Sequence, residues 1–153
     1  MEITCRINGV EKKLVFEPHE RLLKVLRREG YYGVKDGCST GDCGVCTVLV
    51  NGKPVKSCLM FAAQAEGKEI ITIEGLGTAG GPHPIQVAFA DAGAVQCGFC
   101  SPAMILSAKA LLDSNPNPNE EEIRKALDGV LCRCTGYTKI INAVRMAAER
   151  SRR

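Results

Sequence analysis

Residues 37–46, GCSTGDCGVC, place three cysteines in a loop that is interrupted by glycines. Cys38, Cys43 and Cys46 have the spacing C-x4-C-x2-C, and Cys58 follows after eleven further residues. The first three cysteines match the plant-type spacing of [2Fe–2S] cluster ligands. Zinc also binds four thiolates, but usually through short C-x2-C knuckles, so the four-residue gap favours an iron–sulfur site over a zinc site.

The glycines of this loop suit a metal cluster for a physical reason. A [2Fe–2S] cluster with four thiolates carries negative charge, and its sulfurs need hydrogen-bond donors. Backbone N–H groups of a tightly bent loop supply these donors without adding a titratable charge. Gly37, Gly41 and Gly44 allow the bend, because glycine readily adopts a positive φ. We therefore expect the loop to wrap round the cluster, with Cys58 closing the site from the end of a strand.

The residues on either side of the loop predict an α+β domain. Asn8-Gly9 and Asn51-Gly52 are two-residue hairpin signals, each lying between expected strands. A sheet with a helix across one face would bury the apolar sides of both kinds of element. Strands are expected at 2–8, 11–16, 46–50, 54–58 and 69–73, and helices at 20–29 and 59–64.

The character of the chain changes at residues 74–84, EGLGTAGGPHP, which have the glycine and proline content of a linker. Beyond this segment, helical periodicity replaces the alternation that is typical of strands. Helices are expected at 84–93, 102–114, 120–128 and 137–150. The sequence therefore predicts an α+β domain (1–75), a linker (76–83) and an all-helical domain (84–153) that resembles a four-helix bundle.

A second group of cysteines lies in the helical half and comprises Cys97, Cys100, Cys132 and Cys134. Cys100 directly precedes Ser101, an expected N-cap, and Cys134 directly precedes TGYTK, the expected start of the last helix. Helix N-termini present free N–H groups and the positive end of the helix dipole, so two of them directed at one site would stabilise thiolates. The spacings C-x2-C and C-x-C alone leave both zinc and iron–sulfur open.

Composition excludes several other classes. The 153-residue chain has nine cysteines, no Trp and a net charge of only +3, so we expect no nucleic-acid partner. No segment has the length of a membrane span, and the N-terminus lacks the pattern of a signal peptide. A cytoplasmic protein keeps its thiols reduced, which favours metal binding over disulfides. Cys5, the ninth cysteine, lies on the apolar face of the first expected strand and is predicted to fill the core.

Three motifs, GCSTGDCGVCTVLVNG, QCGFCSPAM and CRCTGY, resemble those of one known family when taken together and in this order. They are similar to the small iron–sulfur subunit of the molybdenum hydroxylases, the family of xanthine dehydrogenase, aldehyde oxidase and aerobic carbon monoxide dehydrogenase. The resemblance covers residues 3 to 145, and eight cysteines match in spacing and neighbours. One departure is Ser101-Pro102-Ala103, where relatives often have TPG, and it affects only the local helix geometry.

The resemblance implies two [2Fe–2S] clusters. A ferredoxin-like β-grasp domain would hold the first through Cys38, Cys43, Cys46 and Cys58. The helical domain would hold the second through Cys97, Cys100, Cys132 and Cys134. Gln96 and Cys134 would then approach the molybdopterin of a large catalytic subunit, and electrons would pass through both clusters to FAD on a medium subunit. The resemblance also implies a dimer of heterotrimers.

Two alternatives remain at this point. A free-standing two-cluster electron carrier would have the same thiols but a polar surface and no partner subunits. A zinc-stapled structural adaptor would use the thiols without redox chemistry. The chain shows no GxGxxG dinucleotide fingerprint and no nucleophile–base pair, so we expect no substrate turnover from it alone and no catalytic residue. The substrate, whether xanthine, an aldehyde, carbon monoxide, nicotinate or an aromatic thioester, would be oxidised on another polypeptide.

Overall fold

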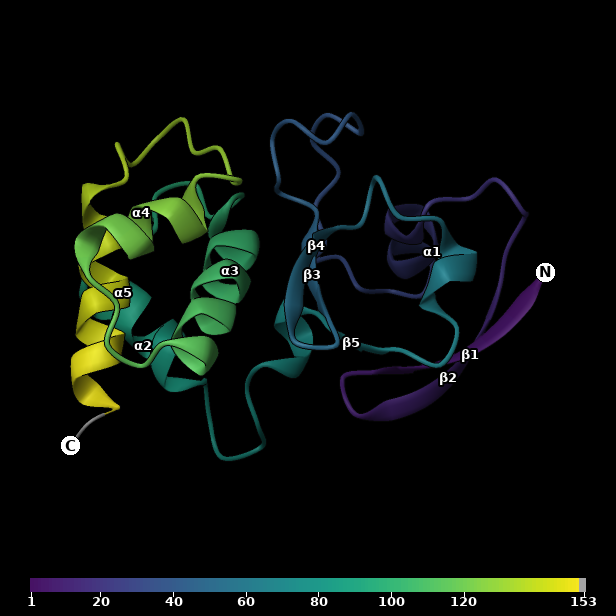
Figure 1. The fold of residues 1–153 in the computed structure, drawn as a ribbon, viewed down its shortest axis with the longest axis horizontal. Helices are drawn as coiled ribbons and strands as arrows, with labels where there is room; N and C mark the ends of the chain where they lie inside the picture. Colours follow the sequence, from purple (N-terminus) through teal and green to yellow (C-terminus); the bar gives the residue numbers. More distant parts are fainter. Residues whose placement is uncertain (152–153) are drawn as a thin grey trace.

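In the computed structural model, which describes residues 1–151, a sheet-containing half and a helical half lie side by side (Figure 1). The strands are β1 (Glu2–Ile7), β2 (Val10–Val15), β3 (Thr47–Val50), β4 (Lys53–Lys56) and β5 (Glu69–Ile71). The helices are α1 (Leu22–Arg28), α2 (Pro84–Asp91), α3 (Ser101–Ser114), α4 (Glu120–Leu127) and α5 (Thr138–Arg150). Two 3-10 helices, η1 (Ala62–Ala65) and η2 (Ile73–Gly75), complete the elements of this part of the chain.

The strands form one mixed sheet in the order β2-β1-β5-β3-β4. β1 pairs with β2 in antiparallel and with β5 in parallel orientation, while β3 is antiparallel to both β4 and β5. Both expected hairpins are present. Asn8 and Gly9 have φ values of 52° and 81°, and Asn51 and Gly52 have values of 49° and 77°, as a two-residue type I′ turn requires.

The sheet half has a core of its own between the sheet and α1. Alternate residues of β1, namely Ile3, Cys5 and Ile7, are buried there with leucines from α1. Cys5 is only 2% exposed, so its predicted place in the core is confirmed. Burial, and then the charge of Glu66, raise the pKa of its thiol, which agrees with an apolar rather than a redox role.

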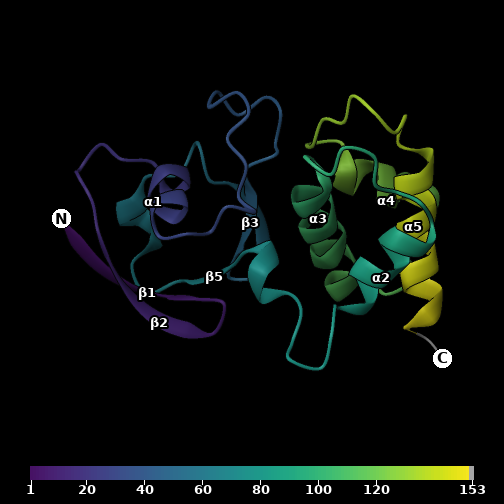
Figure 2. The same cartoon turned by 180° about the vertical axis from the view of Figure 1, so that it is seen from behind.

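The helical half buries a second core, in which Phe89, Met104 and Ile123 are almost inaccessible to solvent. α3 packs against β3 and so forms the boundary between the two halves, as both views show (Figures 1 and 2). Val45, which belongs to the first cysteine loop, is buried in this helical core rather than in the core of the sheet. No helix within residues 1–151 is both long enough and apolar enough to cross a lipid bilayer.

The structure corrects two expectations about helix starts near the cysteines. Cys100, not Ser101, is the N-cap of α3, because its carbonyl oxygen accepts the N–H of Met104 at 3.0 Å. α5 begins only at Thr138, so Cys134 does not directly precede a helix. The reason is the backbone: Gly136 and Tyr137 have φ values of 62° and 67°, and a right-handed helix cannot include them.

One further expectation is corrected in the sheet half. The short helix expected at 59–64 is the 3-10 helix η1, which begins three residues later than expected and ends at Ala65. Gly67 has a positive φ of 66° shortly after it and leads the chain into β5.

Candidate iron–sulfur sites

The first cysteine loop directs backbone N–H groups at a sulfur atom. The N–H groups of Thr40 and Cys43 each donate a hydrogen bond of 3.4 Å to Sγ of Cys38. The N–H of Cys43, and then Thr40, lower the pKa of the Cys38 thiol to about 6. The expected backbone donors are therefore present, and they stabilise negative charge on this sulfur.

Cys46, at the end of this loop, lies next to Cys58. Both are buried, Cys46 just before β3 and Cys58 just after β4. Burial, together with a hydrogen bond to Cys46, raises the pKa of the Cys58 thiol to about 11. The Ser57 hydroxyl donates a 2.7 Å hydrogen bond to the carbonyl oxygen of Cys46, which ties the two segments together. The fold thus brings these two thiols into contact.

The glycines of the loop act in two ways. Gly41 and Gly44 have φ values of 90° and 69°, as expected for a tight bend. Gly37 is different, because it does not appear among the residues with positive φ. A Cβ atom at Gly37 would lie 2.8 Å from Sγ of Cys43, so glycine is needed here for space.

The second cysteine group forms two contacting pairs. Sγ of Cys134 donates a hydrogen bond to Sγ of Cys97 over 3.6 Å. The N–H of Phe99, and then the Cys134 thiol, lower the pKa of Cys97. Burial and a hydrogen bond to Cys132 raise the pKa of Cys100 to about 12. One hollow in the surface is lined by all four of these cysteines.

The paired arrangement of the thiols agrees with a two-iron cluster. Thiols of each group meet in pairs, and a [2Fe–2S] cluster with four cysteines takes two thiolates on each iron. Two thiolates bound tetrahedrally at about 2.3 Å from one metal lie roughly 3.8 Å apart. The 3.6 Å separation of Cys97 and Cys134 fits this geometry.

The two cysteine groups are adjacent, which the spacing of the sequence does not reveal. The N–H of Leu131 donates a 2.8 Å hydrogen bond to the carbonyl oxygen of Cys43. Cys43 and Val45 also line the hollow that holds the second group. The approach is close because Gly44 has no side chain: a Cβ atom there would lie 1.8 Å from the carbonyl oxygen of Gly129.

Two residues that sequence reasoning did not single out contact the second group. The Thr135 hydroxyl donates a hydrogen bond of 3.1 Å to Sγ of Cys132, and the Tyr137 hydroxyl accepts the N–H of Cys132 at 2.8 Å. Burial opposes ionisation of Cys132, but the Thr135 side chain and neighbouring N–H groups lower the pKa of its thiol overall. Thr135 and Tyr137 lie just after the C-x-C motif, and this position in the sequence could have pointed to them.

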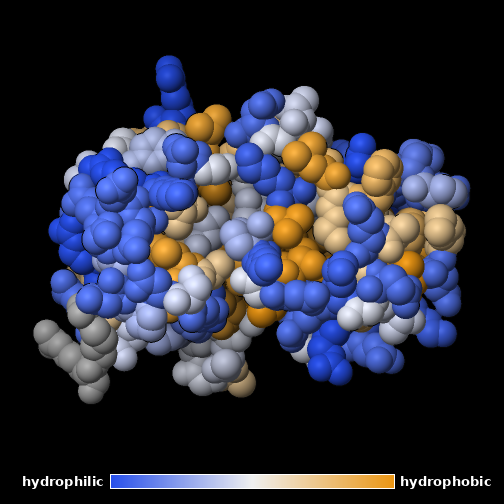
Figure 3. Space-filling model, in the orientation of Figure 1, coloured by the Kyte–Doolittle hydropathy of each residue, from blue (hydrophilic) through white to orange (hydrophobic). Residues whose placement is uncertain are grey.

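Gln96 and Cys134 are both exposed, and Gln96 immediately precedes Cys97. Apolar side chains with 44–56% exposure lie close to them in sequence, namely Val95, Phe99 and Leu131. Figure 3 shows that apolar surface gathers near the middle of this face of the molecule, whereas hydrophilic residues cover most of the helical end. The second cysteine group is therefore accompanied by exposed apolar side chains.

Comparison with known families assigns a cluster-binding domain to each half. Residues 5–72 match the 2Fe-2S iron-sulfur cluster binding domain, and residues 72–145 match the [2Fe-2S] binding domain. Fold and family together define a protein with two [2Fe–2S] binding domains, the first of them ferredoxin-like.

Comparison with individual proteins identifies the family within this class. The chain is 55% identical over 149 residues to the nicotinate dehydrogenase small FeS subunit of Eubacterium barkeri, covering 97% of this chain and 95% of that protein. Among solved structures, quinoline 2-oxidoreductase from Pseudomonas putida 86 has a TM-score of 0.95 and 42% identity, over 99% of this chain and 96% of that one. Aldehyde oxidoreductase from Desulfovibrio desulfuricans has a TM-score of 0.94 and 41% identity, over 99% of this chain but 17% of that one.

The chain belongs to the small iron–sulfur subunits of the molybdenum hydroxylase family. Its role is that of an electron-transfer subunit of an oxidoreductase.

The contact between Gly44 and Gly129 predicts a specific sensitivity to substitution. Gly44→Ala should destabilise the protein by about 1–3 kcal/mol more than Gly52→Ala, because the new Cβ overlaps backbone. Gly52 is a matched control, since its φ of 77° imposes the same backbone strain but no atom lies within 4 Å of a Cβ there. Thermal unfolding and the EPR signals of both clusters are the measurements. Equal effects of the two substitutions would contradict the importance of this contact.

Proposed function

We propose that Cys38, Cys43, Cys46 and Cys58 hold one [2Fe–2S] cluster, and that Cys97, Cys100, Cys132 and Cys134 hold the other. The observation that carries this proposal is that the thiols meet in pairs, as in Cys134 and Cys97 at 3.6 Å. Each bound cluster supplies one-electron redox chemistry. The chain supplies thiolates, N–H donors to sulfur and a buried setting, which together tune the reduction potential.

The second cluster faces the substrate-oxidising partner in this proposal. Gln96 and Cys134 are exposed and would approach a molybdopterin on a large subunit, where an amide side chain offers both a donor and an acceptor. The exposed apolar side chains of Phe99 and Leu131 support a covered surface there, because such groups cluster where proteins associate. Electrons would enter the chain at this end and leave from the first cluster towards FAD on a medium subunit.

The contact between the two loops supports transfer from one cluster to the other. Leu131 precedes Cys132, and its N–H is bonded to the carbonyl oxygen of Cys43. Two proposed ligands of different clusters are thus connected through a short backbone path with one hydrogen bond. The chain's task is to hold this path rigid.

We assign domain boundaries at 1–75 and 84–153, with 76–83 as the linker. Two separate buried cores support this division, one formed by residues up to Ile70 and one mainly by residues after Leu76. The first domain would be a β-grasp and the second a four-helix-bundle-like unit. We also propose a cytoplasmic complex built as a dimer of heterotrimers.

The rival function is a free-standing two-cluster electron carrier. The name of the Eubacterium barkeri relative describes a small subunit, and the aldehyde oxidoreductase contains the matching region within a far longer chain. Both relatives favour the interpretation that this chain functions in contact with a larger polypeptide. The exposed apolar side chains near the second cysteine group favour the same reading.

The assignment of ligands predicts that each cluster can be removed separately. Cys43→Ser should abolish the EPR signal of one cluster and leave the other, because only one thiolate pair is broken. Cys100→Ser should abolish the other signal instead. Cys5→Ala is the control and should keep both signals, since Cys5 lies in the sheet core. Loss of both signals in either serine variant would show that the two sites do not assemble independently.

If Phe99 and Leu131 belong to the surface that contacts the large subunit, a charged substitution there should impair assembly but leave the cluster content unchanged. Leu131→Glu should reduce co-purification of this chain with a co-expressed large subunit at least several-fold, because a charge would be buried unpaired. Val10→Glu is the matched control, since Val10 is 58% exposed and Leu131 56%, but Val10 lies in the distant β1–β2 hairpin.

Size-exclusion chromatography and EPR of both variants provide the readout. If Leu131→Glu associates as well as the control, this surface does not bind the partner. A stable lone monomer of the unaltered chain that ignores the large subunit would instead favour the free-standing carrier.

A further inference from the structure

Tyr137 has a backbone conformation that is unfavourable for its residue type. Its φ and ψ are 67° and −25°, which lie in the left-handed region. A bulky residue other than glycine is rarely found there, and such an outlier persists only where surrounding contacts hold it. The residue lies between the second cysteine motif and α5, so the contacts that hold it bear on the cluster-binding segment.

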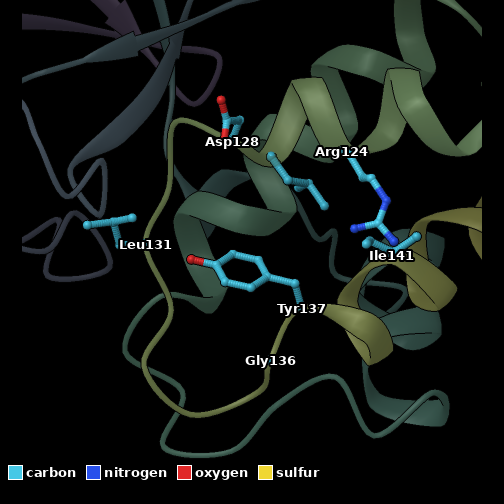
Figure 4. A pocket seen from close by; sticks show the side chains of 7 residues that line it. Arg124, Asp128, Leu131, Gly136, Tyr137 and Ile141 are labelled. Carbon is cyan, nitrogen blue, oxygen red and sulfur yellow. The ribbon is translucent and has the colours of Figure 1, made fainter.

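The Tyr137 side chain folds back on the cysteine motif. Its hydroxyl oxygen accepts the N–H of Cys132 at 2.8 Å and donates to the carbonyl oxygen of Val130 at 3.4 Å. Figure 4 shows the ring inside the bend of this segment, with the hydroxyl directed towards the stretch that carries Leu131. The Cys132 N–H is therefore bonded to a phenol oxygen.

A second hydroxyl supplies the hydrogen bond to the Cys132 sulfur. Thr135 Oγ1 accepts the N–H of Tyr137 at 3.2 Å and donates to Sγ of Cys132 at 3.1 Å. Because the oxygen uses a lone pair for the Tyr137 N–H, its proton is free to point at the sulfur. Hydrogen bonds in such a chain polarise and strengthen one another. Cys132, Thr135 and Tyr137 thus form a closed network.

A purely structural role as the N-terminal cap of α5 would account for fewer of the hydrogen bonds in this network. The N-cap of α5 is Tyr137 itself, and its side chain makes no capping hydrogen bond. The Thr135 oxygen accepts the N–H of Tyr137, which precedes the first turn of the helix. Both hydroxyls are also bonded to Cys132, one at its N–H and one at its sulfur.

We infer that the Thr135 hydroxyl sets the reduction potential of the second cluster, and that Tyr137 is the positioning residue that holds it there. The inference rests on the proposed function, since it takes Cys132 as a cluster ligand. One-electron reduction adds a negative charge, and a donor to a ligand sulfur stabilises the reduced form more than the oxidised form. Removing the donor should therefore lower the potential.

The test is a redox titration, followed by EPR, of the full chain in its assembled complex. Thr135→Val preserves the shape of the side chain but removes the donor. We expect the equilibrium constant for reduction of the second cluster to fall about tenfold, which corresponds to about 59 mV for a one-electron couple. The first cluster should keep its potential and serves as the internal reference. Thr135→Ser should restore the potential, because it retains the hydroxyl.

Thr138→Val is the matched control, since Thr138 is exposed and lies three residues away on α5. An unshifted second-cluster potential in Thr135→Val, or an equal shift in Thr138→Val, would overturn the inference. An unaltered protein that shows no second EPR signal would instead overturn the proposed function, and with it this inference. The two failures are therefore distinguishable.

Tyr137→Phe gives an independent test that does not depend on how well Thr135→Val retains its cluster. It keeps the ring and removes only the hydroxyl. We expect the reduction potential of the second cluster to fall in the same direction as in Thr135→Val, while the first cluster keeps its potential in the same redox titration. Tyr32→Phe, a change at an exposed tyrosine of the sheet half, is the control. Equal second-cluster potentials for Tyr137→Phe and this control would overturn the positioning role of Tyr137.

Discussion

The hydrogen bond between the N–H of Leu131 and the carbonyl oxygen of Cys43 connects two halves that otherwise have separate cores. It requires the first cysteine loop to reach the segment before the second cysteine motif. Gly44 makes this possible, because any side chain at that position would overlap the carbonyl oxygen of Gly129. Val45 then buries its side chain in the helical core. The mutual placement of the two cysteine groups therefore depends on this close backbone contact together with the packing of α3 against β3, and the proposed electron transfer through the chain depends on that placement.

The thiols of each group also share a common electrostatic arrangement. Some sulfurs receive hydrogen-bond donors that favour the thiolate, as Cys38 does from the N–H of Cys43. Others are buried, and burial raises the pKa values of Cys58 and Cys100 to about 11 and about 12. A thiol must lose its proton before it binds metal, so the buried thiols release protons when a cluster is inserted. Each group thus combines a thiol whose pKa is lowered by hydrogen-bond donors with a buried thiol whose pKa is raised.

Much of this structure is readable from local sequence, because local rules govern it. The Asn-Gly hairpins, the alternation of β1 and the helical periodicity after residue 84 each depend on neighbouring residues, and all agree with the structure. The four thiols within each motif are likewise readable from spacing. The contact between Gly44 and Gly129 is not, because it joins residues 85 positions apart. The left-handed conformation of Tyr137 is also hidden, since tyrosine rarely adopts it, and this is why α5 begins at Thr138 and not directly after Cys134. Residues fixed by tertiary contacts are thus the ones that sequence reasoning missed.

All eight thiols of the two cysteine groups are proposed to hold iron–sulfur clusters. Analysis of metal and acid-labile sulfide in the anaerobically purified, full-length chain tests this claim most directly. Two [2Fe–2S] clusters require about four irons and about four sulfides per chain. A chain that contains zinc and no acid-labile sulfide would contradict the claim, because its thiols would then hold a structural metal and provide no path for electrons.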